Sequence, residues 1–179
     1  ILKSLADIGI IGKPNAGKST LINHLTNTKA KTGDYEFTTL HPNVGILKTP
    51  KRNYQLCDIP GLIKDASQGR GLGIRFLKHI ERCDILLHLI DGSNHEFMDS
   101  YNIIQNELRH YSLELSKKKQ IICISKADLI ENKEEIIKAF PQNQKIFFLS
   151  THENIGIKNI LDECYKIIEE NEKIKKETE

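Results

Sequence analysis

The chain has 179 residues, of which 39% are hydrophobic and 28% charged, and its formal net charge is +2. This length and balance are typical of one globular domain and exclude a disordered chain. No apolar run approaches the roughly 18 residues of a membrane-spanning helix, and the small charge excludes nucleic-acid binding that rests on overall charge alone.

The first predicted unit is a strand, a glycine-containing loop and a helix. The apolar run LADIGIIG ends at Gly12, and residues 12–19 read GKPNAGKS, which matches the pattern GxxxxGK[ST]. Glycines in such a loop let backbone N–H groups surround phosphate oxygens, and the following helix adds its positive N-terminus. Lys18 would reach the β- and γ-phosphates, and Ser19 would bind Mg²⁺. The sequence therefore predicts a nucleotide triphosphate site, the alternative being a flexible glycine loop that precedes a helix by chance.

The next segment, DYEFTTLHPN, is polar and has few apolar anchors. A loop threonine can complete the coordination of Mg²⁺ only while a γ-phosphate is bound, which would make this segment an order–disorder switch. Thr38 and Thr39 are the candidates, and a role in a turn or a helix cap is the alternative.

Residues 43–59, NVGILKTPKRNYQLCDI, predict two antiparallel strands joined by a turn from Thr49 to Asn53. Asp58 lies at the carboxyl end of the second strand, where open α/β sheets bind their ligands. There it would hold Mg²⁺ through water, and the backbone N–H of Gly61 would contact the γ-phosphate.

Three further apolar runs, DILLHLID, QIICISKAD and KIFFLST, are continuous rather than alternating. Such runs are typical of strands buried on both faces, so the chain is predicted to be α/β with a mostly parallel sheet. Helical spacing of apolar residues between 103 and 111 and between 157 and 168 predicts helices packed on this sheet. The charged stretch EENEKIKKETE that follows is predicted to be a frayed helix end or a linker.

The run ISKAD predicts the base that the site selects. The carboxylate of Asp128 can accept both N1–H and the exocyclic N2–H of guanine, a pair of donors that adenine lacks on that edge. The stem of Lys126 can lie over the purine ring, and backbone N–H groups of Leu149 to Thr151 can reach guanine O6. An ordinary turn after a strand is the alternative reading of this segment.

The cysteines and histidines show no spacing typical of metal ligands. The cysteines lie far apart and form no CxxC pair, so they are predicted to be reduced core residues of a cytosolic protein. The chain starts at Ile1 with no initiator methionine and no signal-peptide pattern, so we expect an excised domain.

Together these motifs resemble those of translation-factor-type small GTPases and, more narrowly, the G domain of the Obg family. The narrower resemblance rests on GKPNAGKSTLIN, DYEFTTLHPNVGIL and the long stretch DIPGLIKDASQGRGLGIRFLKHIERCDILLHLID. It implies a P-loop NTPase G domain with a six-stranded, mostly parallel sheet, one antiparallel edge strand and helices on both faces. It also implies GTP and GDP as ligands, Mg²⁺ as cofactor and slow hydrolysis of GTP to GDP.

The resemblance further implies a domain organisation and partners. A GTP-binding domain is expected over residues 1–170 and a charged tail or linker over residues 171–179, with a glycine-rich N-terminal domain absent from this chain. The expected partners are the large ribosomal subunit, during its assembly, and guanine tetraphosphate. A cytoplasmic location, no membrane partner and a monomeric isolated domain are expected.

The site residues are carried over from the same resemblance. The nucleotide is expected to contact Gly12, Lys13, Pro14, Asn15, Ala16, Gly17, Lys18, Ser19, Thr20, Phe37, Thr38, Thr39, Asp58, Ile59, Pro60, Gly61, Ser125, Lys126, Asp128, Ser150, Thr151 and His152. The metal is expected at Ser19, Thr39 and Asp58. The residues expected to act in hydrolysis are Asn15, Lys18, Thr39 and Gly61, with Thr39 preferred to Thr38 because of this resemblance.

The sequence departs from the family pattern at two places, of which the second, LST at residues 149–151 in place of the commoner Ser-Ala, changes only a side chain if the contact is made by backbone. The first departure and a difference from Ras-type enzymes affect the predicted chemistry. Ser125 stands where the family usually has an asparagine that donates to guanine N7 and braces the phosphate loop, so binding is predicted to be weaker by the ~1 kcal/mol of one hydrogen bond. Leu62 stands where Ras-type enzymes place the glutamine that orients the attacking water. We therefore expect catalysis by electrostatic positioning, and as a hypothesis a K⁺ ion held by Asn15 beside the phosphates; a turn residue is the alternative role for this asparagine.

Two other functions stay open from the sequence. The first is an ATPase of the related YchF type, against which Pro60 and Asp128 argue. The second is a module that holds a guanine nucleotide without turnover and serves as a docking surface, which the missing glutamine after Gly61 favours.

Overall fold

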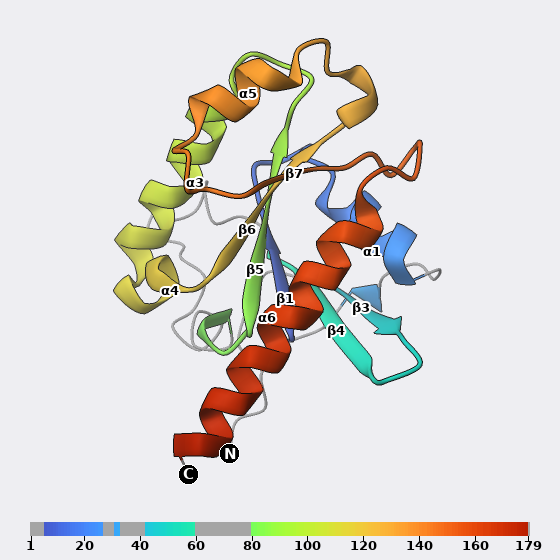
Figure 1. The fold of residues 1–179 in the computed structure, drawn as a ribbon, viewed down its shortest axis with the longest axis vertical. Helices are drawn as coiled ribbons and strands as arrows, with labels where there is room; N and C mark the ends of the chain where they lie inside the picture. Colours follow the sequence, from blue (N-terminus) through green and yellow to red (C-terminus); the bar gives the residue numbers. More distant parts are fainter. Residues whose placement is uncertain (1–5, 27–30, 33–41, 60–79, 179) are drawn as a thin grey trace.

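The computed structural model describes residues 6–26, 31–32, 42–59 and 80–178, and these form a sheet flanked by helices (Figure 1). The sheet has seven strands in the order β2-β3-β4-β1-β5-β6-β7. The strands are β1 (Ile8–Ile11), β2 (Lys31–Thr32), β3 (Asn43–Lys48), β4 (Asn53–Asp58), β5 (Ile85–Asp91), β6 (Gln120–Ser125) and β7 (Ile146–Phe148). The described helices are α1 (Lys18–Thr26), α3 (Phe97–Tyr111), α4 (Leu113–Lys117), the 3₁₀ helix η1 (Ala127–Leu129), α5 (Lys133–Ala139) and α6 (Ile157–Thr178).

The strand directions confirm the predicted α/β architecture. Strand β1 pairs in parallel with β4 and β5, and β6 pairs in parallel with β5 and β7. Strand β3 runs antiparallel to β4, and the turn between them is closed by a bond from Thr49 N–H to the carbonyl oxygen of Arg52 at 3.2 Å. Six of these seven strands are those expected from the sequence. The seventh, the two-residue β2, pairs with β3 and extends the sheet on that side.

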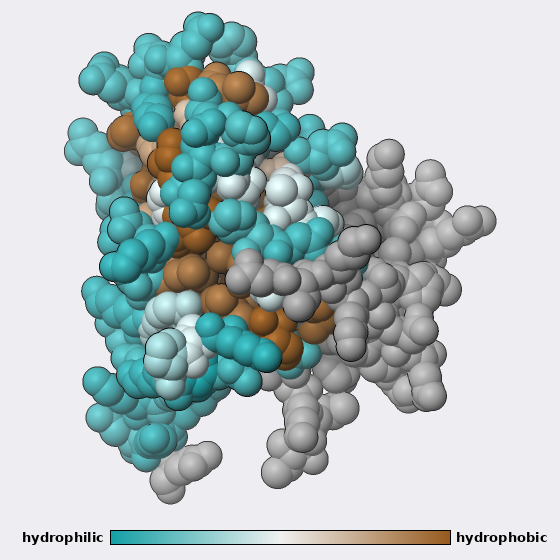
Figure 2. All heavy atoms as spheres, turned by 90° about the vertical axis from the view of Figure 1, so that its right-hand side faces the viewer, coloured by the Kyte–Doolittle hydropathy of each residue, from teal (hydrophilic) through white to brown (hydrophobic). Residues whose placement is uncertain are grey.

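The central strands are buried on both faces because helices cover the sheet from two sides. Residues of α1 and α6 share one core cluster with β1 and β4, among them Leu21, Ile22, Ile160 and Cys164. Residues of α3 and α4 share a second cluster with the opposite face, and α5 packs with α3 in a third. Figure 2 shows hydrophilic residues over much of the described surface on one side of the molecule, with a strip of hydrophobic residues between them.

The four cysteines are confirmed as free core residues. Cys57, Cys83, Cys123 and Cys164 are all buried and none is in a disulfide. Burial raises the pKa of the Cys83 and Cys164 thiols to about 12, so these thiols stay protonated at neutral pH. Within the described part of the chain, no group of three or more histidine, cysteine or acidic residues could hold a metal ion, and no helix there has the length and hydrophobicity to cross a membrane.

The charged C-terminal stretch differs from the predicted frayed end or linker. Helix α6 continues through it to Thr178. The Asn171 side chain donates to the backbone oxygen of Asp84 at 3.1 Å, and Glu172 pairs with Arg52. These contacts with the body of the domain explain why the helix does not end with its last apolar turn.

Candidate nucleotide site

The predicted phosphate loop lies between β1 and α1. Its backbone takes positive φ at Gly12 (157°), Asn15 (68°) and Gly17 (100°). A Cβ atom at position 12 would lie 2.5 Å from the carbonyl oxygen of Leu89, so only glycine fits there. The first turn of α1 therefore begins directly after a glycine-dependent bend, as a phosphate-binding loop requires.

Lys18 is the cation at the centre of this loop. Its Nζ donates to the carbonyl oxygens of Gly12 at 2.9 Å and Lys13 at 3.0 Å. Burial lowers the pKa of Lys18, and the charge of Asp58 partly opposes that shift. A buried ammonium group is stabilised by a nearby negative charge, so the position favours an anionic ligand.

Ser19, Asn43 and Asp58 meet beside the loop from three different elements, α1, β3 and β4. The Ser19 hydroxyl donates to Asp58 Oδ2 at 3.2 Å, and Asn43 Nδ2 donates to the Ser19 hydroxyl oxygen, also at 3.2 Å. Asp58 is only 5% exposed. Burial raises the pKa of Asp58, while Lys18, Ser19 and Asn43 act to lower it.

These residues fit a magnesium ion. Hydroxyl and carboxylate oxygens are ligands that Mg²⁺ prefers, directly or through water. Asp58 Oδ1 is buried and has no hydrogen-bond partner among the described residues. This oxygen is therefore an acceptor that the water of a hydrated cation would use. Ser19 and Asp58 are therefore the described residues that could hold the metal.

Ser125 braces the phosphate loop from the end of β6. Its hydroxyl oxygen lies 2.7 Å from the carbonyl oxygen of Ala16 and 3.2 Å from that of Ile90. A hydroxyl has one hydrogen to donate, so the two carbonyl groups share the donor and none is left for a base. The serine thus contacts the loop but has no second donor of the kind an asparagine amide would offer.

The candidate base-binding residues come from two loops that hydrogen bonds bring together. Ala127 N–H donates to the carbonyl oxygen of Leu149 at 3.0 Å, and Leu149 N–H donates to that of Ile124 at 2.9 Å. A hydrogen bond from the buried Ser150 hydroxyl lowers the pKa of Asp128, and His152 adds a smaller effect in the same direction. Asp128 is therefore ionised at neutral pH and exposed where a ligand can reach it.

The other predicted site residues lie at the loop surface, in the core or outside the described residues. Pro14, Asn15 and Thr20 are exposed, and Thr151 is half-buried. Ile59 is 1% exposed and its N–H donates to Ile10, so it contributes to the core. The remaining predicted residues, Phe37, Thr38, Thr39, Pro60 and Gly61, lie outside the described residues, as does Leu62.

Two residues that the sequence analysis did not assign also lie at the site. Asn43 begins β3, and nothing in its local sequence points to Ser19, which is 24 positions away. Asp91 ends β5 and forms an ion pair with Lys126. Its position at the carboxyl end of an apolar run is the same signal that identified Asp58 and could have found it.

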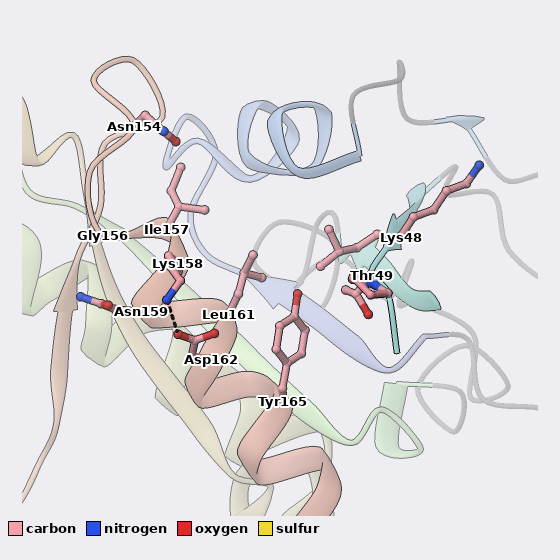
Figure 3. Close-up of a pocket in the computed structure, with 12 residues that line it drawn as sticks. Lys48, Thr49, Asn154, Gly156, Ile157, Lys158, Asn159, Leu161, Asp162 and Tyr165 are labelled. Carbon is pink, nitrogen blue, oxygen red and sulfur yellow. Dashed lines mark ion pairs between the residues drawn. The ribbon is translucent and has the colours of Figure 1, made fainter. Parts of the chain in front are cut away.

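A cavity of about 490 Å³ lies elsewhere, between the β3–β4 turn and the first half of α6. Figure 3 shows Tyr165 and Leu161 of α6 on one side of it and Lys48 and Thr49 on the other. None of the predicted site residues lines this cavity.

Comparison with known proteins decides the family. The sequence model of the 50S ribosome-binding GTPase family matches residues 7–126, which include the phosphate loop, Asp58 and Lys126. The chain belongs to this family of 50S ribosome-binding GTPases.

Curated members of the family confirm the narrower resemblance. GTPase Obg of Rickettsia felis is 45% identical over 177 residues, a match that covers 96% of this chain and 53% of that protein. GTPase Obg of Rickettsia bellii is 49% identical over 165 residues, and that of Pelagibacter ubique is 47% identical over 163 residues. The chain is similar to the Obg GTPases and spans about half the length of these relatives.

Solved structures of other GTPases share the fold. The G domain of the T. maritima FeoB iron transporter superposes with a TM-score of 0.66 at 19% identity, covering 89% of this chain and 96% of that one. Aquifex aeolicus Era, in a complex with GDP and AlF4⁻, gives a TM-score of 0.66 at 23% identity, covering 92% of this chain and 57% of that one. These matches confirm the G-domain architecture.

Proposed function

We propose that the chain is a GTP-binding molecular switch that hydrolyses GTP to GDP and phosphate with Mg²⁺. The observation that carries this proposal is the arrangement of candidate groups at one edge of the sheet. The Lys18 ammonium, the Ser19–Asp58 pair and the Asp128–Ser150 pair all follow the carboxyl ends of parallel strands. They match in order the phosphate, metal and base parts of one nucleotide.

The ionised carboxylate of Asp128 supports guanine as the base. Guanine presents two adjacent N–H donors to such an acceptor, whereas adenine offers no such pair on that edge. The hydrogen bond from Ser150 holds Asp128 in its acceptor-only form at neutral pH. This argument and the Obg relatives favour GTP over the ATPase alternative.

In the proposed reaction, water attacks the γ-phosphorus and the bond from that phosphorus to the β,γ-bridging oxygen breaks. GDP leaves with the bridging oxygen, and the protons of the water end on the released phosphate. Lys18 would stabilise the charge that develops on the β- and γ-oxygens. Ser19 and Asp58 would hold Mg²⁺, which when bound neutralises phosphate charge. Thr39 and Gly61 keep their proposed roles as the metal and γ-phosphate contacts of the two switch segments.

The proposed rate is slow because Leu62 has no polar atom with which to orient water. Asn15, exposed at the tip of the loop, is the proposed ligand of a K⁺ ion that would add positive charge beside the phosphates. The same absence of a glutamine favours the second candidate function, a module that holds guanine nucleotide without turnover.

The family description supports a partner for the switch. We propose that the GTP-bound form acts on the large ribosomal subunit during its assembly, in the cytoplasm, and that guanine tetraphosphate competes for the same site. Residues 1–170 are proposed to form the nucleotide-binding unit, monomeric in isolation.

Single-turnover release of phosphate from GTP tests the proposed reaction. The native chain with Mg²⁺ should release phosphate, and Lys18→Ala should slow that release by about 100-fold or more, because one group that stabilises the transition state is lost. Lys158→Ala, at an exposed lysine of α6, is the control and should leave the rate unchanged. No release in either K⁺ or Na⁺ buffer would instead support the module without turnover. Equal rates in the two salts would contradict the role of Asn15 alone.

A further inference from the structure

Asp91 is a carboxylate beside the candidate base site that has no role in the proposed reaction. It is the last residue of β5 and lies in register with Ser125 of β6, one position before Lys126. The strand ends are joined by a bond from Gly92 N–H to the carbonyl oxygen of Ser125 at 3.1 Å. The sheet therefore fixes Asp91 beside the loop that carries the candidate base-binding residues.

Both carboxylate oxygens of Asp91 have defined partners. Oδ2 accepts from the ammonium group of Lys126 at 2.6 Å. Oδ1 accepts from the backbone N–H of Ser93 at 2.9 Å and from its hydroxyl at 2.6 Å. Partial burial acts to raise the pKa of Asp91, but the bonds from Lys126 and Ser93 outweigh it and lower the pKa, so the group is ionised at neutral pH. Asp91 is thus a rigid anion aimed at Lys126.

Lys126 is held at both ends. Its backbone has the left-handed conformation, with φ 57° and ψ 41°, which sets the direction in which the side chain leaves the loop. Its ammonium group ends on Asp91, and its side chain remains 38% exposed. Between these fixed ends lies a chain of four methylene groups that a flat ring can cover, since a lysine stem is apolar although its tip is charged.

We propose that Asp91 is a positioning residue for the nucleotide base: it anchors the Lys126 ammonium so that the methylene stem is already laid out as a surface for the purine. This inference rests on the proposed function, because it assumes that a purine nucleotide binds there. Lysine has many rotamers when free, and a stem ordered before binding loses less entropy when the base arrives. Asp91 itself touches Lys126 and not the base.

A double-mutant cycle tests this role. Asp91→Asn keeps the size of the side chain and an acceptor for Ser93 but removes the negative charge opposite Lys126. Lys126→Met keeps an apolar stem and has no ammonium that needs an anchor. The affinity of a fluorescent GDP analogue is measured for the native chain, both single variants and the double variant, and the melting temperature of each is recorded.

In the native background, Asp91→Asn should weaken GDP binding by about tenfold, because a lysine stem that is no longer anchored must be ordered when the base binds. In the Lys126→Met background, the same substitution should change the affinity by less than about twofold. The KM for GTP should rise with kcat nearly unchanged, because the base lies away from the reacting phosphorus. Asp84→Asn is the matched control: it removes the ion pair of Asp84 with Lys175 at the opposite end of β5 and should leave GDP affinity unchanged.

An equal loss of affinity in both backgrounds would overturn the inference, because Asp91 would then act only on the local fold. Unchanged affinity of Asp91→Asn in the native background would overturn it too. If the native chain does not bind the GDP analogue at all, the proposed function fails and takes this inference with it. The native measurement therefore separates that failure from a failure confined to Asp91.

Discussion

At the scale of single residues, Ser125 illustrates how a site can keep one part of a side chain's role and lose another. Its hydroxyl bonds the phosphate loop at Ala16, which is the bracing role expected of an asparagine at this position. The hydroxyl has only that one proton to donate, so no donor remains for the N7 atom of guanine. The loop is therefore held in place while one contact with the base is lost.

Substitutions at Ser125 should separate these two roles. Ser125→Ala removes the brace and should lower the free energy of unfolding by about 1 kcal/mol and weaken GDP binding about fivefold. Ser125→Asn restores an amide and should tighten GDP binding about fivefold. Calorimetric titration with GDP measures the affinities, and urea unfolding measures the stability.

The control is Ser116→Ala on α4, which also removes a hydroxyl bonded to a backbone oxygen, but at a half-buried position outside the candidate site. It should change neither quantity. Unchanged GDP affinity of Ser125→Ala would show that the bond to Ala16 does not support the site.

At the scale of elements, β5 carries a histidine at its centre where the other inward residues are apolar. His88 is fully buried, lies 3.2 Å from Gln105 through Nδ1, and stacks on Tyr101 with ring centroids 5.5 Å apart. Burial lowers the pKa of His88 to about 3, and the charge of Lys18 acts in the same direction. The imidazole is therefore neutral in the folded chain.

This histidine should make the fold sensitive to acid. The unfolded chain binds a proton at His88 below about pH 6.5 and the folded chain only near pH 3, so stability is lost as the pH falls through this window. Between pH 7 and pH 5 the loss attributable to His88 should be about 2 kcal/mol. Urea unfolding at several pH values measures it, and His88→Gln should remove that part of the slope.

His110→Gln, at an exposed position of α3, is the control and should keep the native slope. Identical slopes for the native chain and His88→Gln would mean that the imidazole can be protonated within the fold. That result would contradict its description as a buried neutral group.

The other element with a testable role is the last third of α6. Arg52, from the turn of the β-hairpin, pairs with Glu172 and lies over the ring of Tyr54, 4.5 Å from its centroid. Tyr54 in turn stacks on Tyr165 of α6, with centroids 4.7 Å apart. The helix therefore packs against the hairpin, and these contacts lie at the end of the sheet opposite the candidate site.

Truncation after Glu170 should lower the free energy of unfolding by about 1–2 kcal/mol, because it removes two surface ion pairs and one hydrogen bond from a side chain to a backbone oxygen. GDP affinity should not change, since no residue proposed to bind the nucleotide is lost. Truncation after Lys176 keeps Asn171, Glu172 and Lys175 and should be nearly neutral. Equal stability of the two truncated chains would show that these contacts contribute nothing.

At the scale of the whole molecule, the fold was predictable where burial leaves a continuous pattern. Runs such as DILLHLID and QIICISKAD became the central strands β5 and β6, because strands covered on both faces carry apolar residues at every position. The hairpin was predictable from two short runs around a turn. The two-residue β2 carries no such pattern, since it is defined only by its pairing with β3.

The site was predictable where a local motif carries the chemistry and was missed where the partners are distant in sequence. Lys18 and Ser19 stand in a motif. In the structure Lys18 donates to a carbonyl oxygen of the loop and Ser19 donates to Asp58. Asn43 acts through Ser19, 24 positions away, so only the folded chain reveals it. Asp91 acts through Lys126, 35 positions away, and its only sequence signal is its place at the end of an apolar run. For Thr39 and Gly61, which lie outside the described residues, the roles stay predictions.

The central claim is that this edge of the sheet selects a guanine nucleotide through Asp128. The most direct test is displacement of a fluorescent GDP analogue by GTP, GDP, ATP and XTP, with Mg²⁺ present, on the native chain, on Asp128→Asn and on the exposed control Asp162→Asn. GTP and GDP should displace the analogue from the native chain and ATP should not. Asp128→Asn should move the preference to XTP, because its amide can donate to the carbonyl oxygen that xanthine carries in place of the amino group. Equal displacement by ATP, or an Asp128→Asn variant that keeps the native preference, would contradict the claim.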